Sequence, residues 1–534
     1  MATLSRRHED RDRHAHASVG IAPRAFWGAT TGRGFLGFHA VLPRLPRSRT
    51  IPLAMNGSRR IIGLVLLGGL ALGLRLAVVW ALSADHAGPV AYEHGQIAEN
   101  LLAGRGFSIE FLGSQGPTSQ QAPFYPFLLA AIWACLGVAT PQAILTVQVL
   151  QCLAGTALVL AVAWLGSSLL PDRPSVGWVA ALGAAVYPTH LYMVTHLQVA
   201  LWAALVLTVL LAVCVSPRWR ATRRGAILAG CLAGTLLLME PILALALPIC
   251  AAAFWLGEGE GSWRGRFDRA ALARVALITA IAAAIITPWT LRNWLVHRRL
   301  VPIKSTFGYA FWQGNNPISW GTDKIPKSSA ELLRLQHDGT LSGMDRALWE
   351  ARHETLYIDD VLLKPSGYRE FAGLSEPERS RLLGRRAWEY VRANPVQYGR
   401  LCLRRLQYFL LFDETNPKAA NRLYRISTVA WLVLAGIGLS ISRGRWRELW
   451  PTYAIFAAVL LFHSLVIASA RFRIPVEPLT FVWVATAMAP LAVRLLRRPQ
   501  IRVYRPGEQA RDPFDQAHVL RGPHYEVPVR RRAG

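Results

Sequence analysis

The residues best suited to chemistry lie in one polar stretch between long apolar runs, from Asp85 to Phe127. Apolar residues recur at helical spacing between Tyr92 and Ala103 and glycines follow, which predicts a short amphipathic helix at a membrane boundary. Glu93 falls on its first turn. A carboxylate near the positive end of a helix can accept a proton from an arriving hydroxyl. For a single Glu the alternative is a solvated surface side chain, so the surrounding residues must decide.

Composition and charge indicate which class of protein holds this stretch. The chain is 52% hydrophobic, has 19 Trp, and contains apolar runs near twenty residues long, which is typical of an α-helical polytopic membrane protein. The net charge of +27 comes from Arg clusters in the amino-terminal segment, the short loops and the carboxy-terminal tail, as in cytoplasmic loops of membrane proteins. Nucleic-acid binding is therefore disfavoured. The six cysteines show neither a disulfide framework nor metal-ligand spacing.

The basic loops predict how the apolar runs cross the membrane. Residues 124–139 are read as a juxtamembrane or re-entrant helix, because a full crossing would force the basic loop Ser216–Gly225 outside. About ten spans then remain, with both termini cytoplasmic, in a plasma or inner membrane. The predicted spans are residues 61–83, 144–170, 176–193, 199–215, 226–239, 242–256, 272–288, 426–441, 449–469 and 475–495.

The same reading divides the chain into five parts. Residues 1–58 form a basic segment without apolar periodicity, which predicts disorder and raises the question of whether translation starts near Met55. Residues 59–291 form a transmembrane module whose first outer loop, 84–123, carries the candidate acid. A folded extracytoplasmic domain is expected over 292–422, transmembrane helices over 423–496 and a basic cytoplasmic tail over 497–534.

On this topology, polar residues gather at the outer ends of the spans. Charges beside a bilayer usually mark a cavity or a partner, although Arg and Lys there also serve as headgroup anchors. Acids opposite a basic cluster predict a site for an anionic amphiphile. The residues concerned are Asp85, Glu93, His94, His190, His196, Gln198, Glu240, Arg292, Asn293, Lys304, Arg471, Arg473 and Glu477.

Four segments in order carry a family resemblance: IAENLLAGRGFS, GPTSQQAPFYPFLLAAIWACLG, TPWTLRNW leading to VPIKSTFGYAFWQGNN, and ARFRIPVEPL. Over residues 59–498 the chain resembles the polyprenyl-phosphate-dependent GT-C glycosyltransferases related to protein O-mannosyltransferases and the lipid A aminoarabinose transferase. The resemblance implies a GT-C fold and transfer of a sugar from a lipid phosphate carrier to a lipid, glycan or protein acceptor. It also implies a catalytic acid in the first outer loop, acting as the base or linked to a divalent metal.

This chain departs from the family pattern at that acid. Val90 stands roughly where many members have Asp, and His94 stands where they have Tyr. The resemblance therefore assigns the catalytic role to Glu93 as the nearest acid, with Asp85 in reserve. It leaves a divalent metal open as a cofactor, with no metal ligand assigned.

The expected chemistry follows from the residue types. Glu93 would remove the proton of the acceptor hydroxyl as it attacks the anomeric carbon, which inverts that carbon in one displacement. Cationic side chains would meet the growing charge of the phosphate leaving group. The candidates are Arg292, Lys304, Arg471 and Arg473, while His94, Glu240 and Asn293 are expected to contact substrate.

Two other classes of protein remain as alternatives. A secondary transporter or lipid flippase would use the same spans, but such proteins typically show repeats or ionisable residues near mid-membrane, and apart from Arg75 and His463 these spans have few. A scaffold protein explains the spans but not the crowding of polar residues at one face.

Overall fold

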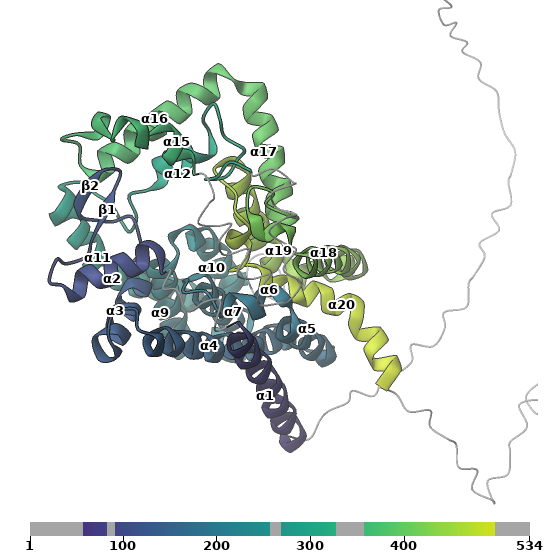
Figure 1. Cartoon of the computed structure of the whole chain (residues 1–534). Helices are drawn as coiled ribbons and strands as arrows, with labels where there is room; N and C mark the ends of the chain where they lie inside the picture. Colours follow the sequence, from purple (N-terminus) through teal and green to yellow (C-terminus); the bar gives the residue numbers. More distant parts are fainter. Residues whose placement is uncertain (1–56, 83–90, 257–268, 327–356, 497–534) are drawn as a thin grey trace, which may run out of the picture. The chain divides into compact units, whose positions relative to one another are not determined.

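The computed structural model of the chain describes residues 57–82, 91–256, 269–326 and 357–496 (Figure 1). The reserve acid Asp85 lies outside these residues, as do nearly all of the predicted disordered segment 1–58 and the predicted tail 497–534. The described residues are largely helical, with one small β-hairpin.

Four described helical stretches are long and apolar enough to cross a membrane. They are Ser58–Ala81 in α1 (Gly57–Ala81), α4 (Pro141–Leu169), α11 (Arg269–His297) and the stretch Arg422–Leu465, which contains α18 (Arg422–Ser442) and α19 (Trp446–Leu465). Shorter apolar helices are α3 (Phe124–Leu136), α5 (Pro174–Val186), α7 (Ala200–Val215) and the stretch Pro241–Leu256. These lengths indicate a membrane protein, and the count of about ten spans stays a prediction.

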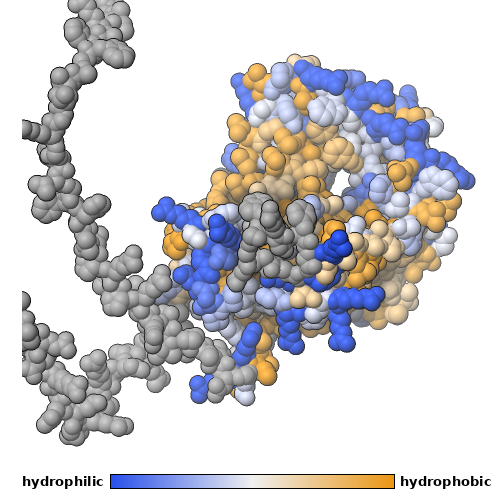
Figure 2. Space-filling view, turned by 180° about the vertical axis from the view of Figure 1, so that it is seen from behind, coloured by the Kyte–Doolittle hydropathy of each residue, from blue (hydrophilic) through white to orange (hydrophobic). Residues whose placement is uncertain are grey.

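The outer surface agrees with a membrane location. Large apolar side chains are exposed along α1 and α11, for example Trp80 at 81% and Leu272 at 57%. In Figure 2 hydrophobic residues cover much of the visible face, and hydrophilic residues gather along its upper rim and its lower edge. Exposed apolar side chains over long helices are what a lipid-facing surface requires.

The predicted interfacial helix over 92–103 is confirmed as α2 (Tyr92–Leu102), which buries Ile97 and Ala98. After it the chain forms an antiparallel hairpin of β1 (Ser108–Phe111) and β2 (Ser114–Pro117), with Ser108 paired to Pro117. Next comes α3, whose thirteen residues fit the predicted juxtamembrane helix better than a full span.

The remaining described helices lie between these elements in the chain or follow them. They are α6 (Pro188–Met193), α8 (Pro217–Arg220), α9 (Arg223–Met239), η1 (Pro241–Ala246), α10 (Leu247–Leu256), α12 (Phe307–Gly314), α15 (Ile358–Leu362), η3 (Lys364–Ser366), η4 (Arg369–Phe371), α16 (Glu376–Ala393), α17 (Pro395–Leu410), η5 (Pro417–Ala420), η6 (Arg443–Arg445), η7 (Ala470–Arg473) and α20 (Glu477–Leu496). Of these, α16 and α17 follow each other closely in the polar segment after α11.

Two apolar cores hold these elements. The larger one joins α1, α4, α5, α7, α9 and α18–α20 through small and branched side chains such as Ala203, Leu207 and Val482. The second joins the β-hairpin, α12 and α16 through Phe111, Phe311 and Leu383. The run predicted over 272–288 is part of the longer helix α11, so Arg292 and Asn293 lie within a helix, and the domain expected from residue 292 stays a prediction.

Candidate functional site

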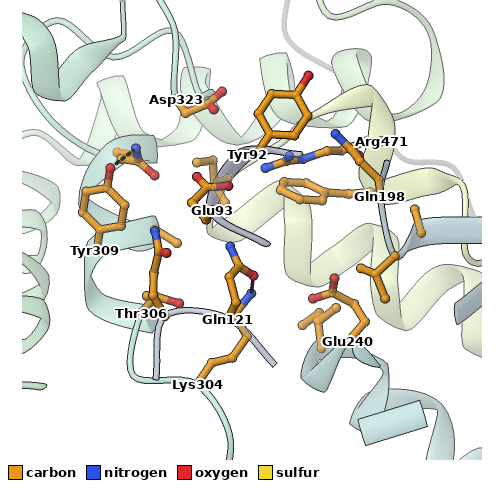
Figure 3. A pocket seen from close by; sticks show the side chains of 18 of the residues that line it. Tyr92, Glu93, Gln121, Gln198, Glu240, Lys304, Thr306, Tyr309, Asp323 and Arg471 are labelled. Carbon is orange, nitrogen blue, oxygen red and sulfur yellow. Dashed lines mark hydrogen bonds between the residues drawn. The ribbon is translucent and has the colours of Figure 1, made fainter. Parts of the chain in front are cut away.

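A cavity of about 430 Å³ opens where the first turn of α2, the end of α9, the segment after α11, α12 and η7 meet. We call it the carboxylate pocket. Its charged lining consists of Glu93, Glu240, Lys304, Asp323, Asp359 and Arg471. Segments far apart in the sequence thus bring four acids and two cations to one place (Figure 3).

Glu93 is half-buried on the first turn of α2 and lies centrally among the side chains of this pocket (Figure 3). The residue before it, Tyr92, has a φ of 49°, a left-handed value that is uncommon outside glycine and occurs often at functional sites. Two residues after Glu93, Gly95 packs so tightly that an added Cβ would lie 2.5 Å from the Cβ of Ala91. The backbone on both sides of Glu93 is therefore closely constrained.

Two further acids, Asp323 and Asp359, line the pocket, and neither was predicted from the sequence. The Asp323 carboxylate accepts a 2.6 Å hydrogen bond from Lys324 Nζ. Burial alone would raise the pKa of Asp323, but the positive charges of Lys324 and Arg471 outweigh it and hold that pKa below its usual value. Asp323 is therefore an anion at neutral pH.

Tyr309 from α12 lies among these acids. Its hydroxyl accepts a 2.8 Å hydrogen bond from Gln313 Nε2. Burial, followed by the negative charges of Asp359, Asp323 and Glu93, raises the pKa of Tyr309 well above its ordinary value, so the hydroxyl stays protonated. The sequence offered no periodic pattern around these residues, which come from the polar segment after α11.

The cations of the pocket are Lys304 and Arg471, both expected from the sequence. Lys304 Nζ donates a 3.1 Å hydrogen bond to Gln121 Oε1, in the loop between β2 and α3. Arg471 is exposed on η7, with its guanidinium carbon 5.3 Å from the centroid of the Phe472 ring. Neither side chain forms an ion pair within 4.0 Å among the described residues, so both charges are available to an anionic ligand.

His94 and Glu240 also line the pocket, as expected. The His94 ring packs edge-on against Tyr125, with ring centroids 5.2 Å apart. Burial, helped by the positive charges of Lys304 and Arg471, lowers the pKa of His94 to about 3, so the imidazole is neutral. Glu240 enters from the C-terminal end of α9.

Arg292 and Asn293 do not line the pocket but support its wall. Arg292 donates to the carbonyl oxygens of Thr118 and Phe107, the latter at 2.9 Å, and its guanidinium lies 5.0 Å from the Trp289 ring centroid. Asn293 is fully buried and donates at 3.0 Å to the carbonyl oxygens of Val301 and Ile303. Their polar groups hold loops rather than face a ligand.

Arg473 also lies away from the pocket lining, although a role in phosphate binding was expected. It is 1% exposed, forms a 2.9 Å ion pair with Glu477, and donates to the carbonyl oxygens of Phe409 and Leu410. Glu477 in turn lies 3.2 Å from His190 Nε2. This buried network joins α20, α17 and α6, so Arg473 is occupied by the protein itself.

The described residues offer no preformed set of ligands for a divalent metal at the carboxylate pocket. The described residues contain no group of three or more His, Cys, Asp or Glu side chains placed to hold a metal ion. The acids of the carboxylate pocket line it from separate elements instead, and Asp323 is already engaged by Lys324.

No protein-family model and no curated protein matches the chain. Among solved structures it is similar to the oligosaccharyltransferase AglB of Archaeoglobus fulgidus in complex with an inhibitory peptide and a dolichol-phosphate, at 15% identity and a TM-score of 0.44 over 82% of this chain and 50% of that one. The same archaeal enzyme tethered with an acceptor peptide matches at 14% identity and a TM-score of 0.48, over 82% and 50% of the two chains. ArnT of Cupriavidus metallidurans bound to undecaprenyl phosphate matches at 16% identity and a TM-score of 0.35, over 82% and 79%.

The chain thus spans about half the length of the archaeal chains that it matches. Because the identities and TM-scores are low, the function proposed below rests on the side chains of the carboxylate pocket.

Proposed function

We propose that this protein is a membrane glycosyltransferase that moves a sugar from a polyprenyl-phosphate carrier to an acceptor hydroxyl, with inversion at the anomeric carbon. The observation that carries the proposal is the meeting of Glu93 with Lys304 and Arg471 in one pocket at the ends of apolar helices. A phosphate-linked donor needs cations for its phosphate, and its acceptor needs a base. The pocket contains both.

The bond changes can be assigned to named groups. Glu93 accepts the proton of the acceptor hydroxyl while the acceptor oxygen forms a bond to the anomeric carbon. The bond from that carbon to the phosphate oxygen breaks, and its electron pair stays on the phosphate. Lys304 and Arg471 stabilise the charge that grows there, because preorganised cations in a partly shielded site interact more strongly than in water.

The remaining acids suit recognition of the sugar. Sugar hydroxyls are good donors to carboxylates, and Asp323 is kept ionised by Lys324 and Arg471. The protonated Tyr309 hydroxyl donates a hydrogen bond to Asp359, which orients that carboxylate toward the pocket. We assign Asp323, Asp359 and Tyr309 to the sugar, and Glu240 and His94 to the wall that orients the acceptor.

The same proposal places the pocket on the extracytoplasmic side of a plasma or inner membrane. The protein would be multi-pass with both termini in the cytoplasm, as the distribution of Arg in the loops favours. The acceptor would be a lipid, a glycan or a protein, and no nucleic acid takes part.

The test uses purified full-length protein in lipid and a radiolabelled polyprenyl-phosphate sugar. Wild-type protein should transfer label to an acceptor fraction, and Glu93→Gln should lower turnover by roughly 100-fold or more while donor binding changes little, because glutamine keeps the shape but cannot take the proton. Asp85→Asn is the matched control for the reserve acid. If Asp85→Asn abolishes transfer and Glu93→Gln does not, the base is misassigned, and movement of the donor across the bilayer without transfer would favour a flippase.

A further inference from the structure

A second hollow lies beside the carboxylate pocket, between residues 300–311 and one face of α16. Its volume is about 710 Å³, and Lys304 lines both hollows. We call it the α16 groove. The chemistry proposed above uses none of its other residues.

The α16 groove is strongly basic. Arg381, Arg385 and Arg392 line it, all exposed, at a spacing that places them along one side of the helix. Among the described residues no carboxylate forms an ion pair with any of the three, and one acid, Glu389, shares the lining. By contrast, Arg386 of the same helix is paired with Glu370 at 2.6 Å.

The α16 groove also has an apolar part, formed by exposed side chains. Leu300 is 76% exposed, Phe307 59% and Trp388 53%, and all three line it. Trp294, in the last turns of α11, is also 47% exposed. Because α11 is long enough to span a membrane and ends at His297, just before Leu300, exposed apolar side chains follow the chain from the end of a candidate span to the groove.

Two glycines bring the walls of the groove together. A Cβ added at Gly308 of α12 would collide with the carbonyl oxygen of Ser380 in α16, and one added at Gly384 would lie 3.0 Å from the Cα of Gly308. The two helices therefore cross with their backbones in contact. The groove is a fixed feature of this crossing rather than a gap between loose segments.

We propose that the α16 groove binds a membrane lipid with a phosphate-bearing headgroup and presents it as the acceptor, an inference that rests on the proposed function. Arginine binds phosphate in a bidentate manner, and the unpaired arginines supply several such forks. The apolar side chains suit acyl chains that arrive along α11. Lys304, at the border of the two hollows, puts an acceptor headgroup next to the donor phosphate.

The apolar approach favours a lipid over an acidic peptide or a free glycan. An acidic peptide or an anionic glycan would use the cations, but neither would need the exposed side chains of Leu300, Phe307 and Trp388. A lipid anchored in the bilayer reaches the groove by lateral diffusion. It needs no exit from the membrane.

The first test measures binding of dioleoyl phosphatidic acid to the detergent-solubilised full-length protein by native mass spectrometry. The double variant Arg381→Ala, Arg385→Ala should bind this lipid roughly tenfold more weakly or worse, because each basic residue near an anionic lipid contributes about 1 kcal/mol. Arg386→Ala removes one paired charge from the same helix and should bind within about twofold of wild type. The double variant Arg381→Lys, Arg385→Lys keeps the charges but loses the bidentate geometry, so its binding should fall between that of the wild type and that of the alanine double variant.

Two further measurements, binding of undecaprenyl phosphate and transfer of label, distinguish a failure of this inference from a failure of the proposed function. In the alanine double variant carrier binding should stay near wild type while transfer to lipid falls. Unchanged phosphatidic acid binding in that variant, an equal loss in Arg386→Ala, or preference for an acidic peptide would overturn the groove assignment and leave the transferase proposal standing. Absence of any transfer by wild-type protein, with the charge-dependent lipid binding intact, would instead sink the transferase proposal and with it the acceptor role of the groove.

Discussion

Arg471 and Arg473 stand two residues apart in η7, yet their surroundings are opposite. Arg471 is exposed beside the carboxylate pocket, whereas Arg473 is buried in an ion pair with Glu477. The sequence reading treated both as phosphate ligands, because the motif ARFR gives no sign of which arginine faces inward. Only the packing of α17, α6 and α20 around Arg473 decides it.

Substituting the two arginines should therefore have different effects, one on carrier binding and the other on stability. Arg471→Ala should weaken binding of polyprenyl phosphate by roughly tenfold, the effect of one lost charge-assisted hydrogen bond, and leave the thermal midpoint almost unchanged. Arg473→Ala should leave Glu477 buried without its partner and cost about 3–5 kcal/mol of stability. Carrier binding and thermal unfolding in detergent, measured side by side, check both, and a stable Arg473→Ala protein with lost carrier binding would reverse the assignment.

His94 should make the protein sensitive to acid. Its pKa of about 3 in the folded protein lies below the ordinary value of 6.5, so the unfolded chain binds a proton more readily. The stability that this group contributes is therefore complete above pH 6.5 and is lost as the pH falls from there towards 3.

The matched variant is His94→Phe, which keeps an aromatic ring against Tyr125 and cannot titrate. The thermal midpoint of wild type should fall by roughly 2 °C or more relative to this variant between pH 7 and pH 4.5. Parallel pH profiles for the two proteins would mean that His94 does not carry the effect.

At the scale of elements, the start of α16 holds the hairpin and the residues after it in place by hydrogen bonds. Glu376 accepts hydrogen bonds from the Thr118 hydroxyl, from the Ser119 backbone amide at 2.8 Å and from the Ser305 hydroxyl. Arg379, one turn later, donates to the carbonyl oxygen of Phe111 at 2.9 Å. The loop that supplies Gln121 to the pocket is thus held by a helix more than two hundred residues later in the chain.

Removing this contact should loosen the pocket without touching its acids. Glu376→Ala leaves three donors without their partner and should lower stability by roughly 1–3 kcal/mol, with a higher KM for the donor. Glu389→Ala, an exposed acid on the same helix, should change stability by less than about 0.5 kcal/mol. Thermal unfolding and donor kinetics measure both, and equal effects of the two changes would contradict a specific role for Glu376.

The same elements show how far the sequence could go. The helical spacing of apolar residues predicted α2, because periodicity reports burial along a helix. Glu93, His94, Glu240, Lys304 and Arg471 were predicted near one another, and they line one pocket. Asp323 and Tyr309 were missed, since a loop and a short helix carry no periodic signal and their neighbours come from distant parts of the chain.

At the scale of the whole molecule, the charge of the loops predicts the side of the membrane on which the pocket opens. The basic loops predict that a reporter fused near Gly314 in α12 lies outside and one near Arg220 in α8 lies inside. Alkaline phosphatase should therefore be active at the first position and green fluorescent protein should fluoresce at the second. A cytoplasmic signal at Gly314 would put the proposed donor on the wrong side.

The shared position of Lys304 gives the reaction a characteristic binding signature. If a donor phosphate and an acceptor phosphate bind on either side of one ammonium group, each reduces the attraction left for the other, and by reciprocity the two affinities fall by the same factor. Saturating acceptor should then raise the dissociation constant measured for the donor, and saturating donor should raise that of the acceptor by the same factor. The geometry of one lysine between two hollows thereby makes two substrates in separate sites weaken each other's binding.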